Sequence, residues 1–384
     1  MKYPPGLQLL LLSAQVKPQP ERLRNLAAAG VDWRAFLGLA QQFRVRPLVY
    51  ENLTRFCWDF VPAEMQREWQ RHARALSHQA LRVTGTLLKI INTFEKEHVP
   101  VVALKGPVLA QQVYGSITLR EFDDVDLLVQ EAHFPKAQTI LQRLGYRADW
   151  EADPTTKLEF LRYQGESVFA NPKGGPPVDL HWRVAVKNNA LPLDVAYFWP
   201  RFRPLQVAGR KLLGFVPEDL ALYLASQGAQ DQWLDVRRLC DLAALIHSNP
   251  DLDWGSVIRE TSRLRGLRVL LLGLRLTEVL SEAGLPEVVR AEIRNDSKIP
   301  GLADKVLAKI TARSSPGEVQ RSMFQIRVKE RLWDKLCLTF GLLIGRTHLD
   351  GQFIMLPKIL WPLYWVVRPL RRLMRTIRSR TARR

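Results

Sequence analysis

The chain has 384 residues, of which 47% are hydrophobic, and a formal net charge of +18. This length and composition are sufficient for two or three folded domains and exclude a disordered chain as the default. The excess of positive charge predicts a polyanionic partner, such as nucleic acid, a nucleotide or an acidic membrane surface.

Residues 1–97 are predicted to form a helical region. Apolar residues recur at helical spacing in RAFLGLAQQFRVRPLVYENL and QALRVTGTLLKIINTFEKEH, with breaks near Pro18 and Pro62. The apolar run LQLLLLSA near the start is short, follows a single Lys2 and lacks a clean cleavage site. It is therefore not typical of a signal peptide.

Residues 98–216 are predicted to form an α+β core. VPVVALKG ends at Gly106 and is followed by Pro107 and VLAQQVYG, which predicts a strand, a tight turn and a helix. VDLLV predicts a second strand, and FPKAQTILQRLGY a helix that ends at Gly145. Further strands are predicted at KLEFLRY, ESVFANP and PVDLHWRV, the last two joined by a KGG turn, and a hairpin at PLQVAGRKLLGFV.

Residues 217–345 return to a helical pattern, and residues 346–384 form a basic, aromatic tail. After Asp350 no acidic residue occurs, whereas nine lysines and arginines follow from Lys358 to Arg384, among Trp361, Tyr364 and Trp365. Residues 358–384 suit an interfacial segment on an anionic membrane surface. The same composition suits RNA phosphates and base stacking, or a docked aromatic segment with a solvated end.

Three aspartates interrupt an apolar run at Asp123, Asp124 and Asp126. Residues two apart in a strand share a face, so Asp124 and Asp126 are predicted to point the same way and Asp123 away from them. Two adjacent carboxylates repel each other unless a cation lies between them; a solvated strand end is the alternative for an isolated pair. Asp179, in the apolar run VDLHW, adds a third strand carboxylate and favours a metal site. His181 shares its face and is a second-tier candidate.

The segment LKGP offers a site for phosphate. A strand that ends at Gly106, followed by a helix, presents backbone N–H groups and the positive end of the helix dipole, and Lys105 adds a charge. Arg120, just before the acidic strand, is a candidate for a second cation. The alternative is that Gly106 makes an ordinary turn and Lys105 is solvated.

The order of these motifs resembles an uncharacterised bacterial nucleotidyltransferase family of the polymerase-β-like superfamily. The resemblance rests on Leu104-Lys105-Gly106, Tyr114, Leu119-Arg120, Asp124 to Val129 and Val178 to Trp182, with support from LAQQFRVRPLVYENL, RRLCDLAALI and WPLYWVVRPLRRL. It implies a mixed-sheet core with a nucleotide-loading helix, flanked by large N- and C-terminal helical regions. Asp124 and Asp126 match the family's paired aspartates, and Asp179 its third carboxylate.

Two departures from the family's pattern stand out. Gly106-Pro107 replaces the superfamily's usual Gly-Ser, and Gln227 and Asp231 stand where relatives often carry histidines. The first departure concerns the phosphate turn. The second puts the role of those histidines in doubt for this chain.

The expected activity is Mg²⁺-dependent transfer of a nucleoside monophosphate from an NTP, such as ATP, to an unidentified hydroxyl acceptor, with release of pyrophosphate. Asp124 and Asp126 are expected to hold Mg²⁺ on the triphosphate, while Asp179 completes a second metal position and helps to deprotonate the acceptor. One alternative makes the acceptor RNA, such as a tRNA end. The other is a non-catalytic scaffold that binds nucleotide or a membrane surface.

The three cysteines, Cys57, Cys240 and Cys337, are widely separated and lack the spacing of a disulfide framework or a zinc site. They favour a reducing compartment. We therefore expect a cytoplasmic protein, with the tail as a peripheral attachment to the inner face of the membrane.

Overall fold

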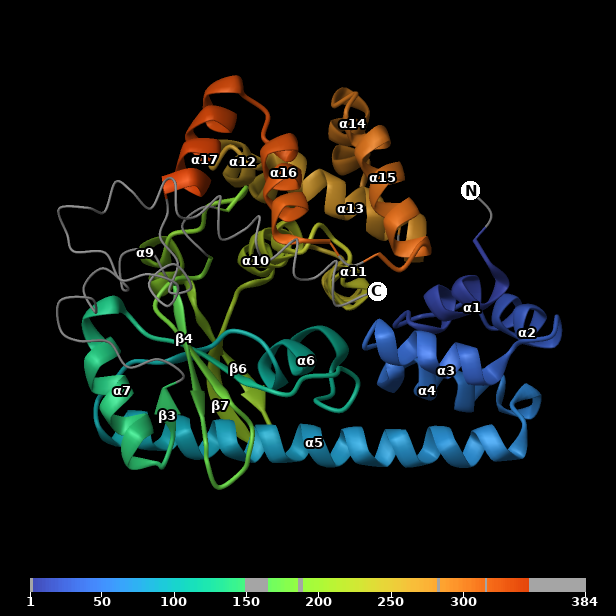
Figure 1. The fold of residues 1–384 in the computed structure, drawn as a ribbon, viewed down its shortest axis with the longest axis horizontal. Helices are drawn as coiled ribbons and strands as arrows, with labels where there is room; N and C mark the ends of the chain where they lie inside the picture. The colour runs from blue at the N-terminus through green and yellow to red at the C-terminus, as the bar shows by residue number, and fades with distance from the viewer. Residues whose placement is uncertain (1–2, 149–164, 186–188, 282–283, 315, 345–384) are drawn as a thin grey trace, which may run out of the picture.

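A computed structural model describes residues 3–148, 165–185, 189–281, 284–314 and 316–344 (Figure 1). Within these residues the chain is a mixed α+β structure, in which a five-stranded mixed sheet has helices before and after it. This is the fold class expected from the sequence. The predicted strand KLEFLRY and the basic tail lie outside the described residues.

The N-terminal region is helical, as the apolar spacing predicted. The helices before Gly106 are α1 (Pro5–Ser13), α2 (Pro20–Ala28), α3 (Trp33–Gln42), α4 (Arg46–Phe56) and α5 (Ala63–Lys96). At about 1.5 Å per residue, the 34 residues of α5 span about 50 Å, and Figure 1 shows them running beneath both the N-terminal helices and the sheet. Trp69 packs in the core of the N-terminal helices, and Phe94 in the core under the sheet. The helix therefore ties two cores together.

The five-stranded sheet has the order β1-β2-β5-β4-β3. Its strands are β1 (Val102–Ala103), β2 (Val125–Leu128), β3 (Arg147–Ala148), β4 (Glu166–Ala170) and β5 (Val178–His181). β2 and β5 are parallel neighbours, and the other pairs are antiparallel. The predicted hairpin with the KGG turn joins β4 to β5. The second predicted hairpin is formed by β6 (Arg203–Val207) and β7 (Arg210–Gly214).

Helices cover the sheet on both sides. α6 (Pro107–Tyr114) follows β1 through the turn at Gly106, and α7 (Phe134–Arg143) follows β2. α5 and α7 contribute to the core under the sheet. Figure 1 shows the C-terminal helices on the opposite side from α5, so the sheet lies between two helical layers.

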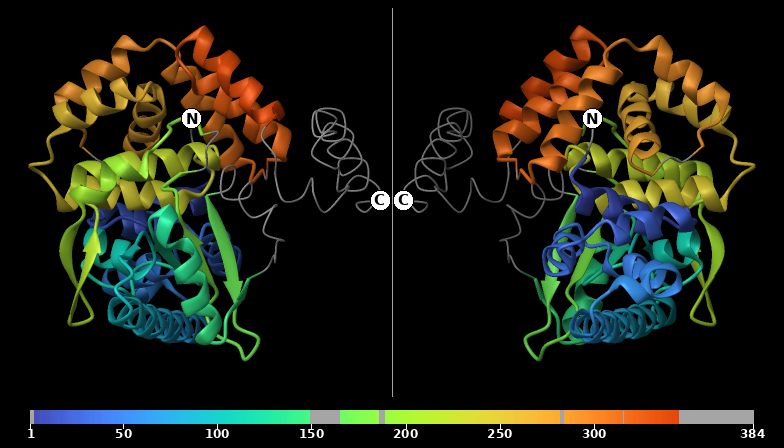
Figure 2. Two further views of the ribbon diagram at one scale, coloured as in Figure 1. Left: turned by 90° about the vertical axis from the view of Figure 1, so that its left-hand side faces the viewer. Right: turned by 90° about the vertical axis from the view of Figure 1, so that its right-hand side faces the viewer.

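The C-terminal helices begin at Pro217, as the PED segment predicted. After the short α9 (Val195–Phe198), they are α10 (Pro217–Gln230), α11 (Val236–Ser248), α12 (Trp254–Arg263), α13 (Leu267–Ser281), α14 (Glu287–Asn295), α15 (Ile299–Thr311), α16 (Glu318–Val328) and α17 (Leu332–Ile344). Figure 2 shows them from two sides, above α5 seen end-on. Buried residues of α1 and α3 share one hydrophobic core with those of α10, α11 and α13. The helices that precede and follow the sheet therefore fold against each other.

Trp233 is the central side chain of this shared core. It is fully buried in the connection between α10 and α11, and its ring lies against the backbone of Gly228 in α10 and Gly273 in α13. A Cβ atom on Gly273 would lie 2.2 Å from the Trp233 ring. Only glycine permits this approach, so the two helices close over the ring.

No helix in the described part of the chain has the length and apolar character that crossing a membrane requires. The apolar segment near the start of the chain is helix α1, whose leucines pack in the shared core.

We predict that Gly273→Ala destabilises the protein by about 1–3 kcal/mol, because the added methyl group overpacks the Trp233 pocket. The matched control is Gly85→Ala, at an exposed position of α5 where a Cβ atom meets nothing within 4 Å. This control should stabilise by up to about 1 kcal/mol, because alanine is the better helix former. Urea unfolding of the three proteins measures both effects. Equal stability of Gly273→Ala and wild type would contradict the packing described here.

Candidate active site

Asp126 and Asp179 are brought together by the parallel pairing of β2 and β5. The two residues are direct partners in the register of these strands. Side chains of register partners project from the same face of a sheet, so the two carboxylates stand side by side. Asp126 is buried and Asp179 is partly buried.

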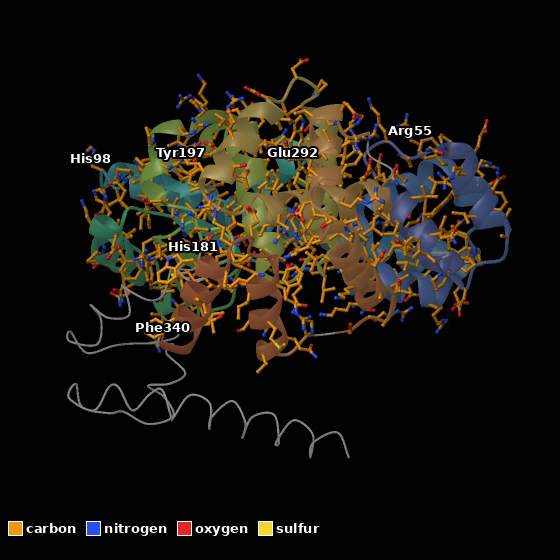
Figure 3. The ribbon with its side chains drawn as sticks, turned by 90° about the horizontal axis from the view of Figure 1, so that it is seen from above. Arg55, His98, His181, Tyr197, Glu292 and Phe340 are labelled. Atoms are coloured by element: carbon orange, nitrogen blue, oxygen red, sulfur yellow. The ribbon has the colours of Figure 1, made fainter. Side chains whose placement is uncertain are left out.

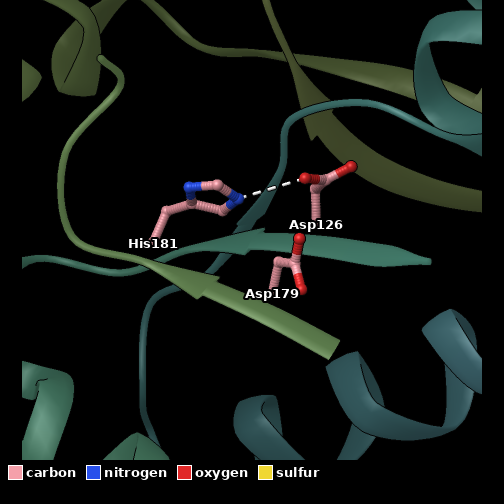
Figure 4. Close-up of side chains that lie close together, drawn as sticks. All are labelled: Asp126, Asp179 and His181. Atoms are coloured by element: carbon pink, nitrogen blue, oxygen red, sulfur yellow. Dashed lines mark hydrogen bonds and ion pairs between the residues drawn. The ribbon is translucent and has the colours of Figure 1, made fainter. Parts of the chain in front are cut away.

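His181 completes a compact cluster with the two aspartates. One ligand atom from each of Asp126, Asp179 and His181 lies within 4.8 Å of the others (Figure 4). Two carboxylates and an imidazole on one face are a donor set that can hold a divalent cation. Asp124 is not one of the three.

Asp126 is held by two cationic partners. Lys105 Nζ donates to Asp126 Oδ1 at 3.0 Å, and His181 Nε2 lies 3.1 Å from the same oxygen. Burial raises the pKa of Asp126, but Lys105 and His181 outweigh it and hold this pKa well below its usual range. Asp126 is therefore an ionised, buried carboxylate.

His181 is held between two carboxylates. Its Nε2 faces Asp126, and its Nδ1 lies 3.0 Å from Glu166 Oε2. Burial lowers the pKa of His181, but the hydrogen bonds to Asp126 and Glu166 raise it to about 9. Glu166 is the register partner of His181 in the antiparallel β4–β5 pair, which explains why their side chains meet.

Asp179 is the less compensated of the two carboxylates. Among the described residues it makes no hydrogen bond or ion pair. Burial, followed by the charge of Asp126, raises the pKa of Asp179 to about 7. Burial and Asp126 also raise the pKa of Asp124, against the opposing charge of Lys105. Asp124 thus contributes to the same field, and a bound cation would relieve the repulsion that raises the pKa of Asp124 and Asp179.

Gly106 shapes the turn that aims Lys105 at the acidic cluster. Its φ of 57° and ψ of −125° belong to a region that side-chain-bearing residues rarely adopt. A Cβ atom there would lie 3.6 Å from the carbonyl oxygen of Asp124. The start of α6 therefore packs directly against the segment that leads into β2.

Arg120 has an internal partner. Its Nε and Nη2 donate to the two carboxylate oxygens of Asp241 in α11, at 2.8 and 2.9 Å, and Tyr114 donates to Asp241 at 3.0 Å. The Arg120 side chain is only 5% exposed. In this structure Arg120 joins the loop before β2 to α11. Its contact with nucleotide stays a prediction.

Four residues near the cluster were not anticipated from the sequence: Glu166, Tyr223, Arg237 and Arg238. Asp235 caps α11 by accepting from the Arg237 backbone N–H at 3.1 Å, which fixes the two arginines in the first turn. The charge of Arg237 lowers the pKa of Asp124. Tyr223 is buried near Lys105 and Asp126, and burial raises the pKa of its hydroxyl. The arginine pair in RRLCDLAALI was the available signal.

Gln227 and Asp231, the two positions that depart from the family's histidines, both contact Arg238. The Nε of Arg238 donates to an oxygen of Asp231, and its Nη1 donates to Gln227 at 3.3 Å. Burial raises the pKa of Asp231 to about 6, although Arg238 opposes this shift. These residues orient an arginine whose charge also acts on Lys105.

Comparison with known protein families assigns the chain to a family. Residues 29–281 match the model of a family described as uncharacterised nucleotidyltransferase. The chain belongs to this family. The resemblance inferred from its motifs is confirmed, and the aspartates and basic residues of the candidate site lie within the matched region. As a member, the protein is a nucleotidyltransferase enzyme, and the identity of its acceptor is open.

Similar solved structures include the lincosamide antibiotic adenylyltransferase LnuA with lincomycin bound. It is 16% identical, with a TM-score of 0.29, over 41% of this chain and 93% of that one. ANT(2'')-Ia in complex with adenylyl-2''-tobramycin is 17% identical, with a TM-score of 0.27, over 55% and 96%. An antigenic nucleotidyltransferase-like protein from Paracoccidioides brasiliensis is 14% identical, with a TM-score of 0.29, over 54% and 93%. At these TM-scores the likeness supports no inference about the acceptor. No curated protein sequence matches the chain.

We predict that Mg²⁺ raises the melting temperature of the wild-type protein. At a concentration a hundredfold above the dissociation constant, the free energy of unfolding should increase by about 2.7 kcal/mol. Asp179→Asn should melt at a higher temperature than wild type in metal-free buffer, because one of the clustered negative charges is removed. The same variant should lose most of the Mg²⁺ effect. Differential scanning calorimetry with and without Mg²⁺ tests this.

The matched control for that experiment is Asp123→Asn. Asp123 is 63% exposed and pairs with Arg44 on the surface, so its replacement should leave the Mg²⁺ effect intact. A full Mg²⁺ effect in Asp179→Asn would show that the cation binds elsewhere.

Proposed function

We propose that the protein transfers a nucleoside monophosphate from an NTP to a hydroxyl acceptor with release of pyrophosphate, and that Mg²⁺ is required. One observation carries this proposal: Asp126 and Asp179 are register partners on neighbouring parallel strands, next to Lys105 at the start of a helix. Family membership supports nucleotidyl transfer in general. Beyond family membership, we propose that the reaction requires Mg²⁺, that the donor is an NTP and that the acceptor carries a hydroxyl group.

The carboxylates Asp124, Asp126 and Asp179 would hold one or two Mg²⁺ ions, and His181 would orient Asp126. When bound, Mg²⁺ supplies charge neutralisation for the triphosphate and the departing pyrophosphate. Lys105 and the backbone N–H groups at the start of α6 would contact phosphate oxygens, and the backbone conformation of Gly106 supports this close approach.

We assign Asp179 as the general base that accepts the proton of the acceptor hydroxyl. A general base is most effective when its pKa lies near the operating pH, and burial places that of Asp179 at about 7. It also makes no hydrogen bond or ion pair among the described residues, although the charge of His181 partly opposes the rise of its pKa. Asp126, which is paired to Lys105 and His181, is suited to binding a cation and not to accepting a proton.

The two alternatives have less support. An RNA acceptor, such as a tRNA end, draws on the net charge of +18, but nine of these charges follow Asp350 and lie in the tail. A non-catalytic scaffold would not need to keep an uncompensated carboxylate in a partly buried site. The complete set of three aspartates therefore favours the enzyme.

Asp126→Asn should reduce transfer of labelled nucleoside monophosphate by at least about a hundredfold, because the variant keeps the shape of the side chain and loses the charge that binds the cation. The assay uses each NTP labelled at the α-phosphate, Mg²⁺ and a cell extract as the source of acceptor. Asp123→Asn is again the control and should retain full activity. Turnover near wild-type level in Asp126→Asn would refute the assigned site.

We infer in addition that the protein is cytoplasmic and attaches peripherally to an anionic membrane surface. α17 exposes an apolar stripe made of Leu332, Trp333 and Leu336, which are 73%, 68% and 54% exposed. Figure 3 shows this end of the molecule, with Phe340 of α17 at the edge and His181 in the interior. In the sequence, α17 is followed by residues 358–384, which contain nine lysines and arginines and three aromatic residues. Exposed apolar residues beside excess positive charge suit an anionic interface.

The triple variant Leu332→Ser, Trp333→Ser, Leu336→Ser should reduce co-sedimentation with vesicles that contain phosphatidylglycerol several-fold, because the apolar part of the interface is removed. Binding of the wild type should weaken at high salt and be low on pure phosphatidylcholine vesicles. Leu81→Ser is the control, since Leu81 is 59% exposed on α5, far along the sequence from the tail. Equal sedimentation of the triple variant and wild type would exclude the stripe. Salt-sensitive binding of RNA in place of vesicles would favour the nucleic-acid alternative.

A further inference from the structure

A cavity of about 620 Å³ lies at the carboxyl ends of the two parallel strands. Its lining includes Gln130 and Glu131, which follow β2, and Trp182 and Arg183, which follow β5. The remaining wall comes from α9, the segment just before it, and the end of α12. Cavities of about 300–1,000 Å³ typically enclose small molecules of drug size.

The cavity and the acidic cluster share the same two strands. Arg183 lies four residues after Asp179 and two after His181, so at about 3.3 Å per residue it is at most about 13 Å from Asp179. In α/β sheets, ligands bind outside the carboxyl ends of the parallel strands. None of the cluster residues lines the cavity, so a molecule seated there would have to extend its hydroxyl group beyond the cavity to reach Asp179.

The walls of the cavity are mainly apolar. Leu193, Ala196, Trp199 and Leu264 provide aliphatic and aromatic surface. This surface suits the carbon skeleton of a ring or chain and offers little to a polyanion. A nucleic acid would instead require a basic groove with exposed aromatic platforms.

The charged side chains of the cavity also favour a small molecule over a polyanion. Glu131 and Asp194 supply two negative charges, and Arg183 supplies one positive charge. Arg183 Nη2 lies 3.7 Å from Glu131, a long ion pair, and the Arg183 Nε is buried without a hydrogen-bond partner among the described residues. A buried donor without an acceptor is unfavourable, and either a water or an oxygen of a bound molecule would satisfy it.

We propose that this cavity is the acceptor site, and that the acceptor is a small, largely apolar molecule with a hydroxyl group and an oxygen that accepts from Arg183. This inference rests on the proposed function, because it assigns the acceptor of that reaction. The two carboxylates of the lining, Glu131 and Asp194, make RNA a poor fit for the cavity. The body of the acceptor lies against α9, and its hydroxyl group is directed to the cluster of Asp126 and Asp179.

The test uses Ala196→Trp, which fills the cavity from an exposed position of α9, and Arg183→Met, which removes the donor. Ala28→Trp, at an exposed position of α2, is the matched control for adding a large side chain. The acceptor sources are a low-molecular-mass filtrate of a bacterial lysate and, separately, total RNA from the same cells. Transfer is measured with NTPs labelled at the α-phosphate, and nucleotide affinity by calorimetry with a non-hydrolysable NTP analogue.

We expect the wild type to label a small molecule in the filtrate and not the RNA. Ala196→Trp should reduce this labelling at least tenfold with unchanged nucleotide affinity, and Arg183→Met should raise about tenfold the amount of filtrate needed for half-maximal rate. Labelling of RNA, or full labelling of the filtrate by Ala196→Trp, would overturn the cavity assignment and leave nucleotidyl transfer standing. No labelling of either source by the wild type would count against the proposed function itself.

Discussion

The parallel pairing of β2 with β5 is the constraint on which the site depends. It makes Asp126 and Asp179 register partners, so two carboxylates occupy adjacent positions in a poorly solvated place. Their repulsion is only partly relieved by the protein. Lys105 and His181 both turn to Asp126 and none of the described cations pairs with Asp179. The asymmetry separates the two acids chemically: one is permanently ionised, and the other titrates near neutral pH.

The helical regions maintain that arrangement from outside the sheet. Asp241 of α11 binds Arg120, which fixes the loop that leads into β2, and Glu121 in the same loop accepts hydrogen bonds from Arg46 of α4. The acidic strand is therefore held from both the C-terminal and the N-terminal helices. These helices share one core, to which Trp233 belongs, so the two contacts that hold the loop before β2 come from one packed unit. This explains how a small sheet can keep two like charges close together.

The sequence was informative where side chains obey a local period. The helices on either side of the core followed from apolar spacing, and Asp126 lies in the predicted strand; β2 begins at Val125, however, so Asp124 precedes the strand and its shared face with Asp126 stays a prediction. The sequence could not reveal which strands are neighbours. That Asp126 faces Asp179 depends on the β2–β5 register, and that Glu166 reaches His181 depends on the register of β4 with β5. Pairing of this kind is decided by the whole core.

Arg120 is a second residue whose tertiary partner the sequence could not reveal. A single cation before an acidic strand is compatible with phosphate binding, and the sequence carries no local sign that Asp241, 121 residues later, accepts from the Nε and Nη2 of Arg120. The arginines that do lie near the cluster, Arg237 and Arg238, belong to a helix start whose position over the sheet is a tertiary property. Basic residues can be counted from the sequence, but their partners cannot.

The replacement of Gly-Ser by Gly106-Pro107 is better understood from the geometry than from the motif. Gly106 keeps the positive φ that brings the start of α6 against Asp124, so the shape of the turn survives. Proline at the first helical position removes one N–H that has no partner within the helix, and its φ is already helical. The substitution therefore removes one donor to phosphate and the serine hydroxyl, without changing where the helix points. Lys105, which precedes the glycine, is then the principal cation of the turn. A bound cation would compete with Lys105 for Asp126, and a triphosphate would compete with Asp126 for Lys105.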